Sequence, residues 1–320
     1  MCTAIHLKFY AGRNLDIDQA YGGEVIITPK FCPLHFKTSP SICDHPAIIG
    51  IGIEKEGYPL YFDAVNEHGL YIAALNYTGN AHYHGPKNGM INLAPYEIIP
   101  YILATCRSIR EAKTTLESTN VTSIAFCESL PLAELHFFIA DESGALVAEP
   151  DPFGLNIHDN PIGVLTNNPP FPIQLFNLQK YAGLSNLPIE NRLSHSIPFK
   201  EYSNGMSAIG LPGDLSSESR FVRAAFHTLM SQSYYTLPQI MHLLASVEMP
   251  QGSVKTHHGY ERTEYTSAVD LSTMTYYYKA YDSLGTCSVL LSNDISNQSK
   301  IIKYPIIKIP PSNGGYFSFG

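Results

Sequence analysis

The 320-residue sequence contains no tryptophan and no run of about 18 apolar residues, the length that a membrane-spanning helix requires. Its first residues, MCTAIHLKFYAGRN, place no basic segment before a long apolar run, so no signal peptide is predicted. Internal repeats and low-complexity tracts are absent as well. Together these absences predict a globular protein of the cytoplasm.

Positive charge is scarce in this chain. It has 20 lysine and arginine residues against 28 aspartate and glutamate residues, which gives a formal net charge of −8 at pH 7. A protein that binds nucleic acid or an anionic membrane needs a basic surface to displace counterions. The overall charge therefore argues against both partners, although it still allows a local basic pocket for a small anion.

The six cysteines include no CxxC pair and no spacing typical of a zinc site. Two histidine pairs, His82 with His84 and His257 with His258, lack a third histidine or a carboxylate at a matching interval. The sequence therefore predicts no metal and no other cofactor. In a reducing cytoplasm the five cysteines after Cys2 are expected to be free thiols. They are Cys32, Cys43, Cys106, Cys127 and Cys287.

Strand patterns dominate the first third of the chain. Residues 24–29, 47–54 and 70–77 are rich in β-branched and aromatic residues and are separated by Gly, Pro and Asn. Their apolar runs are nearly continuous, which predicts strands that are covered on both faces. A helical spacing of apolar residues follows over 95–118.

The middle of the chain predicts further strands and one long loop. Residues 135–141 and 145–150 predict a hairpin, and 162–169 predicts a strand that ends in a proline-stopped loop. Residues 183–205 are polar, with Pro, Asn and Ser throughout, and predict an excursion outside the core.

Two helices and a last group of strands complete the pattern. The helices are predicted over 217–231 and 236–249, the second with Thr236 as its N-cap. Strands follow over 264–271, 274–282 and 286–292. Parallel alternation of strands and helices is weak, so this order favours antiparallel sheets between helical layers. We expect an α+β architecture in a single domain of residues 1–320.

The N-terminus carries a pattern with a chemical meaning. Methionine before a small residue such as cysteine is commonly removed, which would leave Cys2 with a free α-amine beside its thiol. An α-amine has a reference pKa of about 7.7–8.0, so a fraction of it is neutral at pH 7 and can take the thiol proton. Cys2 is therefore a candidate nucleophile that carries its own base.

The segment GRNLDI at 12–17 places Arg13 and Asp16 three residues apart in an otherwise uncharged stretch. If residues 3–9 form a strand, a tight turn at Gly12 would return this pair to the start of the strand. Arg13 would then favour the thiolate of Cys2, and Asp16 would orient the α-amine. The alternative is a surface ion pair without a catalytic role.

Five motifs occur in one order along the chain: MCTAI at the start, GRNLDI at 12–17, ALNYTGN at 74–80, IGVLTNNP at 162–169 and GLPGDLSSESRF at 210–221. Together they resemble the choloylglycine hydrolase family, and its conjugated bile acid hydrolases in particular. The resemblance extends from residue 1 to about 290. It implies the N-terminal nucleophile hydrolase fold, a four-layer αββα sandwich of two antiparallel sheets.

Position by position, the resemblance implies a cysteine nucleophile, a charged pair beside it, two oxyanion-hole residues and a second arginine near the thiol. Asn76 is implied to act through its backbone N–H and Asn167 through its side-chain amide. Two aimed donors of this kind each contribute on the order of 10²–10³ in rate. The six implied catalytic residues are Cys2, Arg13, Asp16, Asn76, Asn167 and Arg220.

These assignments have simpler alternatives. Asn76 and Asn167 lie where strands are predicted to end, and asparagine is a common turn residue. Asn167 is distinguished from Asn168 by the register of the motif alone. Arg220 has a structural alternative as a partner of Glu218 or as part of a helix cap.

The resemblance also implies a substrate class, the glycine- and taurine-conjugated bile salts, whose amide bond would be hydrolysed. Asparagine at position 76 favours this class, because penicillin V acylases of the same family often carry tyrosine there. A steroid buries a large apolar face, so an apolar pocket is expected. Register places Leu15, Phe62, Phe126, Leu130 and Leu135 at its lining, with ordinary core positions as the alternative.

Other functions remain open at this point. The sequence departs from the usual pattern at 135–137, where LHF replaces LHW, and at 77–78, where Tyr–Thr replaces Phe–Pro. Both changes affect pocket loops, so no preference between glycine and taurine is predicted. Alternatives are a penicillin V acylase, an acylase for N-acyl homoserine lactones, and a catalytically inactive sterol-binding protein. Because relatives are often tetramers, a homotetramer is expected, with 183–205 as a candidate assembly loop.

Overall fold

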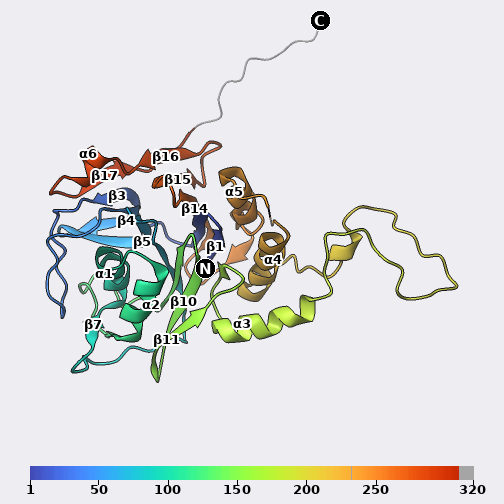
Figure 1. Cartoon of the computed structure of the whole chain (residues 1–320), viewed down its shortest axis with the longest axis horizontal. Coiled ribbons are helices and arrows are strands. Elements are labelled where there is room, and N and C mark those ends of the chain that lie inside the picture. Colours follow the sequence, from blue (N-terminus) through green and yellow to red (C-terminus); the bar gives the residue numbers. More distant parts are fainter. Residues whose placement is uncertain (232, 310–320) are drawn as a thin grey trace, which may run out of the picture.

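The computed structural model describes residues 1–231 and 233–309, which form two large antiparallel sheets with helices packed on their outer faces (Figure 1). The first sheet contains, in spatial order, β12 (Val164–Leu165), β1 (Cys2–Leu7), β2 (Tyr10–Ile17), β14 (Tyr260–Asp270), β15 (Thr275–Ala280) and β16 (Cys287–Leu290), with β13 (Val254–Lys255) beside β14. The second contains β11 (Gly154–Asp159), β10 (Gly144–Asp151), β9 (Leu135–Asp141), β6 (Tyr71–Asn76), β5 (Tyr58–Asn66), β4 (Ile48–Lys55), β3 (Glu24–Thr28) and β17 (Ile302–Pro305).

The helices form the outer layers. Helices α1 (Ile98–Thr105) and α2 (Ile109–Glu117) cover the second sheet, and α4 (Ser217–Met230) and α5 (Leu237–Ala245) cover the first. A two-stranded parallel pair, β7 (Ile91–Leu93) with β8 (Thr119–Val121), lies beside α2. The remaining elements are α3 (Phe171–Leu178), α6 (Asn293–Ser296) and three 3₁₀ turns at Pro95–Glu97, Gln179–Tyr181 and Met206–Ala208. The order of layers is the predicted αββα arrangement.

The second sheet is covered on both faces, which explains its continuous apolar runs. Along β3, Val25 and Ile27 belong to the core cluster that includes strands of both sheets, while Ile26 belongs to the cluster under α1 and α2. Successive side chains of a strand point to opposite faces, so a strand covered on both sides places apolar residues on both of its faces. The prediction for these strands is confirmed.

Several predicted boundaries change. The helix expected over 95–118 is two helices, because the segment 106–108 interrupts it and Ser108 caps α2 by accepting from the Glu111 N–H at 3.3 Å. Thr236 caps α5 as predicted, but that helix ends at Ala245. Strand β5, at 58–66, was not predicted.

The N-terminal hairpin turns earlier than expected. Its turn lies at residues 8 and 9, where Lys8 has a positive φ of 56°, and the predicted turn at Gly12 is wrong. Gly12 instead lies inside β2 opposite Ala268 of β14. Any side chain there would collide with the carbonyl group of Ser267, so glycine allows the two strands to pair.

The segment 183–205 contains no helix or strand and extends away from the body of the molecule (Figure 1). This agrees with the predicted excursion. All six cysteines lie within the described residues and are free thiols, as expected. In the parts of the chain that the structure describes, no helix combines the length and the apolar character needed to cross a bilayer.

Candidate active site

The hairpin of β1 and β2 brings Arg13 to the thiol of Cys2. Cys2 pairs with Leu15 in the ladder, and Arg13, two residues earlier on β2, projects from the same face as Leu15. Arg13 Nη2 lies 2.6 Å from Cys2 Sγ. Its Nη1 donates to the carbonyl oxygens of Phe62 at 2.9 Å and Ala74 at 2.6 Å, which direct the guanidinium toward the sulfur. Both residues are buried.

The charge of Arg13 is maintained by its surroundings. Burial acts to lower the pKa of this guanidinium, but Cys2, Tyr265 and Asp63 outweigh that effect and raise it above its ordinary value. Arg13 is therefore a charged donor in direct contact with the sulfur of Cys2.

Asp63 is a buried carboxylate near Arg13 that the sequence analysis missed. Burial raises the pKa of Asp63, whereas Arg13 and the hydroxyl groups that donate to Asp63 lower it. The only available signal was a single charge in the otherwise uncharged segment 57–66. Its four donors are the hydroxyls of Tyr265 at 2.6 Å, Tyr276 at 2.6 Å, Ser267 at 2.9 Å and Tyr71 at 3.2 Å.

Asp16 lies beside the main-chain nitrogen atoms at the N-terminus. Its backbone oxygen accepts from the α-amine of Met1 at 2.6 Å, and that amine also contacts the carboxylate of Glu261. Burial lowers the pKa of the Met1 α-amine; Arg220 and Arg13 act in the same direction, while Cys2 and Asp16 oppose it. The terminal nitrogen is thus held in an environment that favours its neutral form.

The side chain of Asn167 connects Asn76 with Cys2. Its Oδ1 accepts from the backbone N–H of Cys2 at 2.8 Å, and its Nδ2 donates to the carbonyl oxygen of Asn76 at 2.7 Å. The side chain of Asn76 is exposed and accepts from Thr78, so only its backbone faces this network. Asn168 donates to the Thr78 carbonyl instead, which separates the roles of the two neighbouring asparagines.

Arg220 contacts the backbone of Cys2. Its Nη1 donates to the Cys2 carbonyl oxygen and to Thr3 Oγ1, each at 2.6 Å, and its Nη2 donates to Asn167 Oδ1 at 2.8 Å. Nη1 also lies 3.8 Å from Asp16 Oδ2. Arg220 therefore orients the groups around the thiol, and Glu218, its alternative partner, accepts from Asn177 instead.

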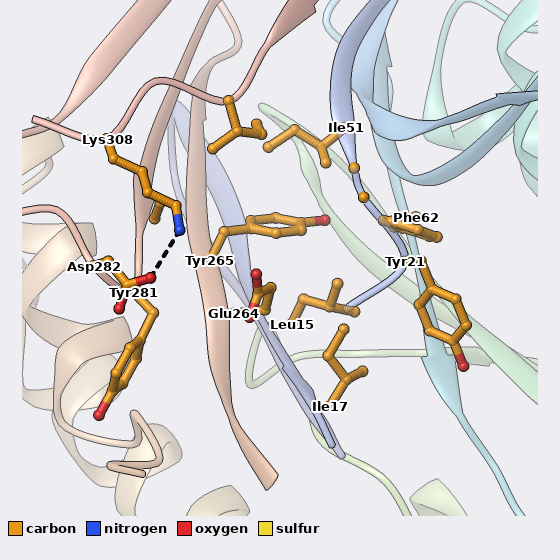
Figure 2. A pocket seen from close by; sticks show the side chains of 14 residues that line it. Leu15, Ile17, Tyr21, Ile51, Phe62, Glu264, Tyr265, Tyr281, Asp282 and Lys308 are labelled. Carbon is orange, nitrogen blue, oxygen red and sulfur yellow. Dashed lines mark hydrogen bonds and ion pairs between the residues drawn. The ribbon is translucent and has the colours of Figure 1, made fainter. Parts of the chain in front are cut away.

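A cavity of about 180 Å³ opens between the two sheets beside Leu15 (Figure 2). Leu15, Ile17 and Tyr265 line it from the first sheet, and Ile51 and Phe62 line it from the second. Its rim is polar, with Lys308 paired to Asp282 at 2.8 Å. Cys2 does not itself line this cavity; it is connected to the cavity through Leu15, its partner in the ladder of β1 and β2.

The five residues expected to line a substrate pocket do not all meet there. Leu15 and Phe62 line the cavity. Phe126 packs against two aromatic rings, Tyr96 at 5.3 Å and Tyr58 at 6.0 Å between ring centroids.

The last two of these residues are Leu130, on the segment before β9, and Leu135, the first residue of β9. Leu130 lies in a turn closed by its bond to Cys127 at 3.1 Å. Leu135 pairs with Asn76 at the end of β6, which places it beside the asparagine network.

Metal ligands do not converge in the described part of the chain. Within residues 1–231 and 233–309, no group of three or more His, Cys, Asp and Glu side chains could hold an ion. The rings of His82 and His84 lie 4.8 Å apart, but His84 Nε2 faces the Asp151 carbonyl oxygen at 3.3 Å.

Comparison with known proteins gives consistent matches over almost the whole chain. Residues 2–304 match the family described as linear amide C–N hydrolases, choloylglycine hydrolase family. A bile salt hydrolase/transferase of Lactiplantibacillus plantarum is 44% identical over 314 residues, covering 96% of this chain and 97% of that protein.

Solved structures give the same result. A variant of the conjugated bile acid hydrolase from Clostridium perfringens superposes with a TM-score of 0.91 at 30% identity, covering 98% of this chain and 99% of that one. The penicillin V acylase from Agrobacterium tumefaciens has a TM-score of 0.72 at 17% identity over 95% and 91% of the two chains, a likeness of fold alone.

Proposed function

The chain belongs to the choloylglycine hydrolase family of linear amide C–N hydrolases, and on that premise we propose that it hydrolyses glycine- and taurine-conjugated bile salts with Cys2 as nucleophile. It has the N-terminal nucleophile hydrolase fold and is an amidase. The observation that carries the proposed role of Cys2 is the contact of Arg13 Nη2 with its sulfur. The substrate class is supported by similarity over nearly the whole chain to a bile salt hydrolase/transferase and a conjugated bile acid hydrolase.

The mechanism begins with loss of Met1, which converts the backbone nitrogen of Cys2 into an α-amine. That nitrogen already lies 2.8 Å from Asn167 Oδ1, so one hydrogen bond would hold it in place. Its lone pair takes the thiol proton, and the thiolate beside Arg13 attacks the amide carbonyl carbon of the substrate. The α-amine is therefore the base, and no side chain is needed for that role.

Attack places negative charge on the substrate oxygen. We assign its stabilisation to the backbone N–H of Asn76 and to Asn167 Nδ2, whose position is set by the bond to the Asn76 carbonyl oxygen. Collapse breaks the C–N bond, and the α-amine returns its proton to the departing glycine or taurine nitrogen. Water then hydrolyses the thioester, releasing the bile acid and restoring the thiol.

Two charged residues position this machinery. Asp16 Oδ2 is buried and has no hydrogen-bond partner among the described residues, which leaves it available to the α-amine of Cys2. Arg220 holds the Cys2 carbonyl and Asn167 Oδ1 at once, so it fixes the nucleophile relative to the oxyanion donors. We propose positioning roles for both residues.

The substrate site is proposed at the cavity beside Leu15. The surface of a steroid is mainly apolar, and burial stabilises binding by roughly 25 cal/mol per Å² of apolar area. Leu15, Ile17, Ile51 and Phe62 supply such a surface, and Leu15 is the ladder partner of Cys2. The loop of Phe126 and Leu130 and the nearby Leu135 are proposed to contact the rest of the steroid.

Release of glycine from glycocholate by the processed protein tests this proposal. Cys2→Ser should fold normally and lose nearly all activity, because a hydroxyl is far less ionised than a thiol. Cys32→Ser, at another buried cysteine, is the matched control and should keep its activity. Activity of Cys2→Ser within a few-fold of wild type would exclude the thiol as nucleophile. Faster release of homoserine lactone than of glycine or taurine would support a quorum-signal acylase instead.

We also propose that 183–205 is the assembly loop of a homotetramer. Its large apolar side chains are exposed, among them Leu187 at 67%, Leu193 at 86% and Tyr202 at 86%. Leu193→Ser with Tyr202→Ser should lower the mass measured by light scattering. Phe153→Ser, which removes an apolar side chain that is 92% exposed on the β10–β11 turn, is the control. An unchanged mass in the double variant would contradict the proposal.

A further inference from the structure

One buried pair of side chains holds both ends of the loop 166–171, which carries Asn167. At the first end, His136 Nε2 lies 3.0 Å from the Thr166 carbonyl oxygen. At the second end, both carboxylate oxygens of Glu149 lie 3.1 Å from the backbone nitrogen of Phe171 and accept from it. His136 Nδ1 and Glu149 Oε1 are 3.0 Å apart, so the two ends are connected through these side chains.

The protons of this pair follow from its partners. A carbonyl oxygen only accepts, so Nε2 of His136 must carry a hydrogen. The contact between Nδ1 and Oε1 also needs one proton, whichever of the two atoms holds it. An imidazolium with a carboxylate, or a neutral imidazole with a carboxylic acid, satisfies both conditions without leaving an uncompensated buried charge. His136 is fully buried and Glu149 is 3% exposed.

The imidazole of His136 also supports the second asparagine. It stacks on the ring of Tyr77 with centroids 4.4 Å apart and an interplanar angle of 7°. Tyr77 directly follows Asn76, and Thr166 directly precedes Asn167. One side chain therefore contacts the chain neighbour of each proposed oxyanion residue.

We propose that His136 and Glu149 are positioning residues that aim Asn167 Nδ2 at the reaction centre. The proposal rests on the assigned role of Asn167. Oxyanion donors must be held to within about 0.5 Å of their productive position, and partners behind the donors provide that rigidity. Thiol activation is separate, because Arg13 reaches the sulfur of Cys2 from β2.

Other hydrogen bonds keep the loop 166–171 folded when the bonds from His136 and Glu149 are weakened. Gln174 Nε2 donates to Thr166 Oγ1 at 3.1 Å and to the Asn167 carbonyl oxygen at 3.2 Å. Ser217 Oγ accepts from the Asn167 N–H at 2.8 Å. Loss of the bonds from His136 and Glu149 should therefore make the position of the Asn167 amide less fixed without unfolding the loop.

Two reactions of Cys2 distinguish positioning from a general structural role. Amide hydrolysis builds an oxyanion, whereas alkylation by iodoacetamide displaces iodide and builds none. Alkylation is followed at the Cys2 peptide by mass spectrometry, because the bond from Ser129 lowers the pKa of the Cys127 thiol and makes it a competing site.

His136→Phe keeps the ring that stacks on Tyr77 but removes both N–H groups. Its kcat should fall about 30-fold while KM and the alkylation rate stay within about threefold of wild type. Glu149→Gln should keep most of the activity, because Gln Oε1 can accept from Phe171 while its amide donates to Nδ1 of a neutral histidine. His84→Phe, at a histidine outside this network, is the matched control.

Equal losses in hydrolysis and alkylation, or an unchanged kcat in His136→Phe, would overturn the proposal. Thermal unfolding checks each variant, and His136→Gln, which keeps one amide donor, carries the same test if His136→Phe does not fold. Rates are measured on whichever of glycocholate and penicillin V the wild type hydrolyses. Failure of wild type on glycocholate then counts against the proposed substrate, and the ratio of hydrolysis to alkylation still decides the role of His136.

Discussion

The hydroxyl of Thr263 donates to Asp16 Oδ1 at 2.6 Å, while Oδ2 of the same carboxylate has no donor among the described residues. Asp16 is fully buried, and the nearest charged group of Arg220 is 3.8 Å away. Burial raises the pKa of Asp16; Arg220 and the Thr263 bond act against that effect. A half-satisfied buried carboxylate of this kind is suited to receive one more donor, which we assign to the α-amine of Cys2.

This relationship predicts the acid side of the pH profile. Asp16 must be ionised to accept from the amine, so kcat/KM should fall as the pH drops through its raised pKa. Thr263→Val removes a donor that lowers this pKa, and the acid limb should therefore move to higher pH. Thr266→Val, on the same strand but bonded to Asn14 and Glu248, is the control. Identical acid limbs in wild type and Thr263→Val would show that ionisation of Asp16 does not determine the acid side of the profile.

Removal of Met1 should accompany activity. The α-amine of Met1 occupies the region beside Asp16 and Glu261, so a retained methionine leaves Cys2 with an amide nitrogen that cannot accept a proton. Intact-mass measurement of active protein should show the loss of one methionine. An active fraction that retains Met1 would show that the α-amine is not the base.

Asn167→Ala should lower kcat by about 10²-fold with a smaller change in KM. The lost Nδ2 is proposed to act on the oxyanion, whose charge develops only in the transition state. Asn168→Ala is the natural control, because its amide donates to the Thr78 carbonyl and lies outside the network around Cys2. Steady-state kinetics on both variants make the comparison. A change confined to KM would assign Asn167 to substrate binding.

Substrate choice should depend mainly on the steroid. Glycine and taurine differ only in a small anionic end, so glycocholate and taurocholate are expected within about tenfold of each other in kcat/KM, because most binding energy scales with buried apolar area. Penicillin V should be a much poorer substrate, since its phenoxy group covers little of a steroid-sized surface. One parallel assay at equal enzyme concentration measures all three. Faster turnover of penicillin V than of either bile salt would favour the acylase alternative.

The sequence alone was sufficient to predict the parts of the site whose residues lie close together along the chain. Cys2 and Arg13 are only 11 residues apart, so a short hairpin brings them together even though the turn lies at residues 8 and 9. Alternation along β2 then puts Arg13 and Leu15 on one face. The apolar runs likewise predicted sheets covered on both faces, because periodicity reflects burial directly.

Tertiary structure decided every feature that depends on pairing between distant segments. Thr263 reaches Asp16 only because β14 pairs with β2 across 247 residues, and His136 reaches Thr166 across 30. Asp63 and its four hydroxyl donors come from four separate strands of two sheets. No local pattern encodes such contacts, since a buried polar residue in a strand resembles any other until its partners are in place. The same reason explains why Leu15 and Phe62 share a cavity while Phe126 packs against Tyr58 and Tyr96.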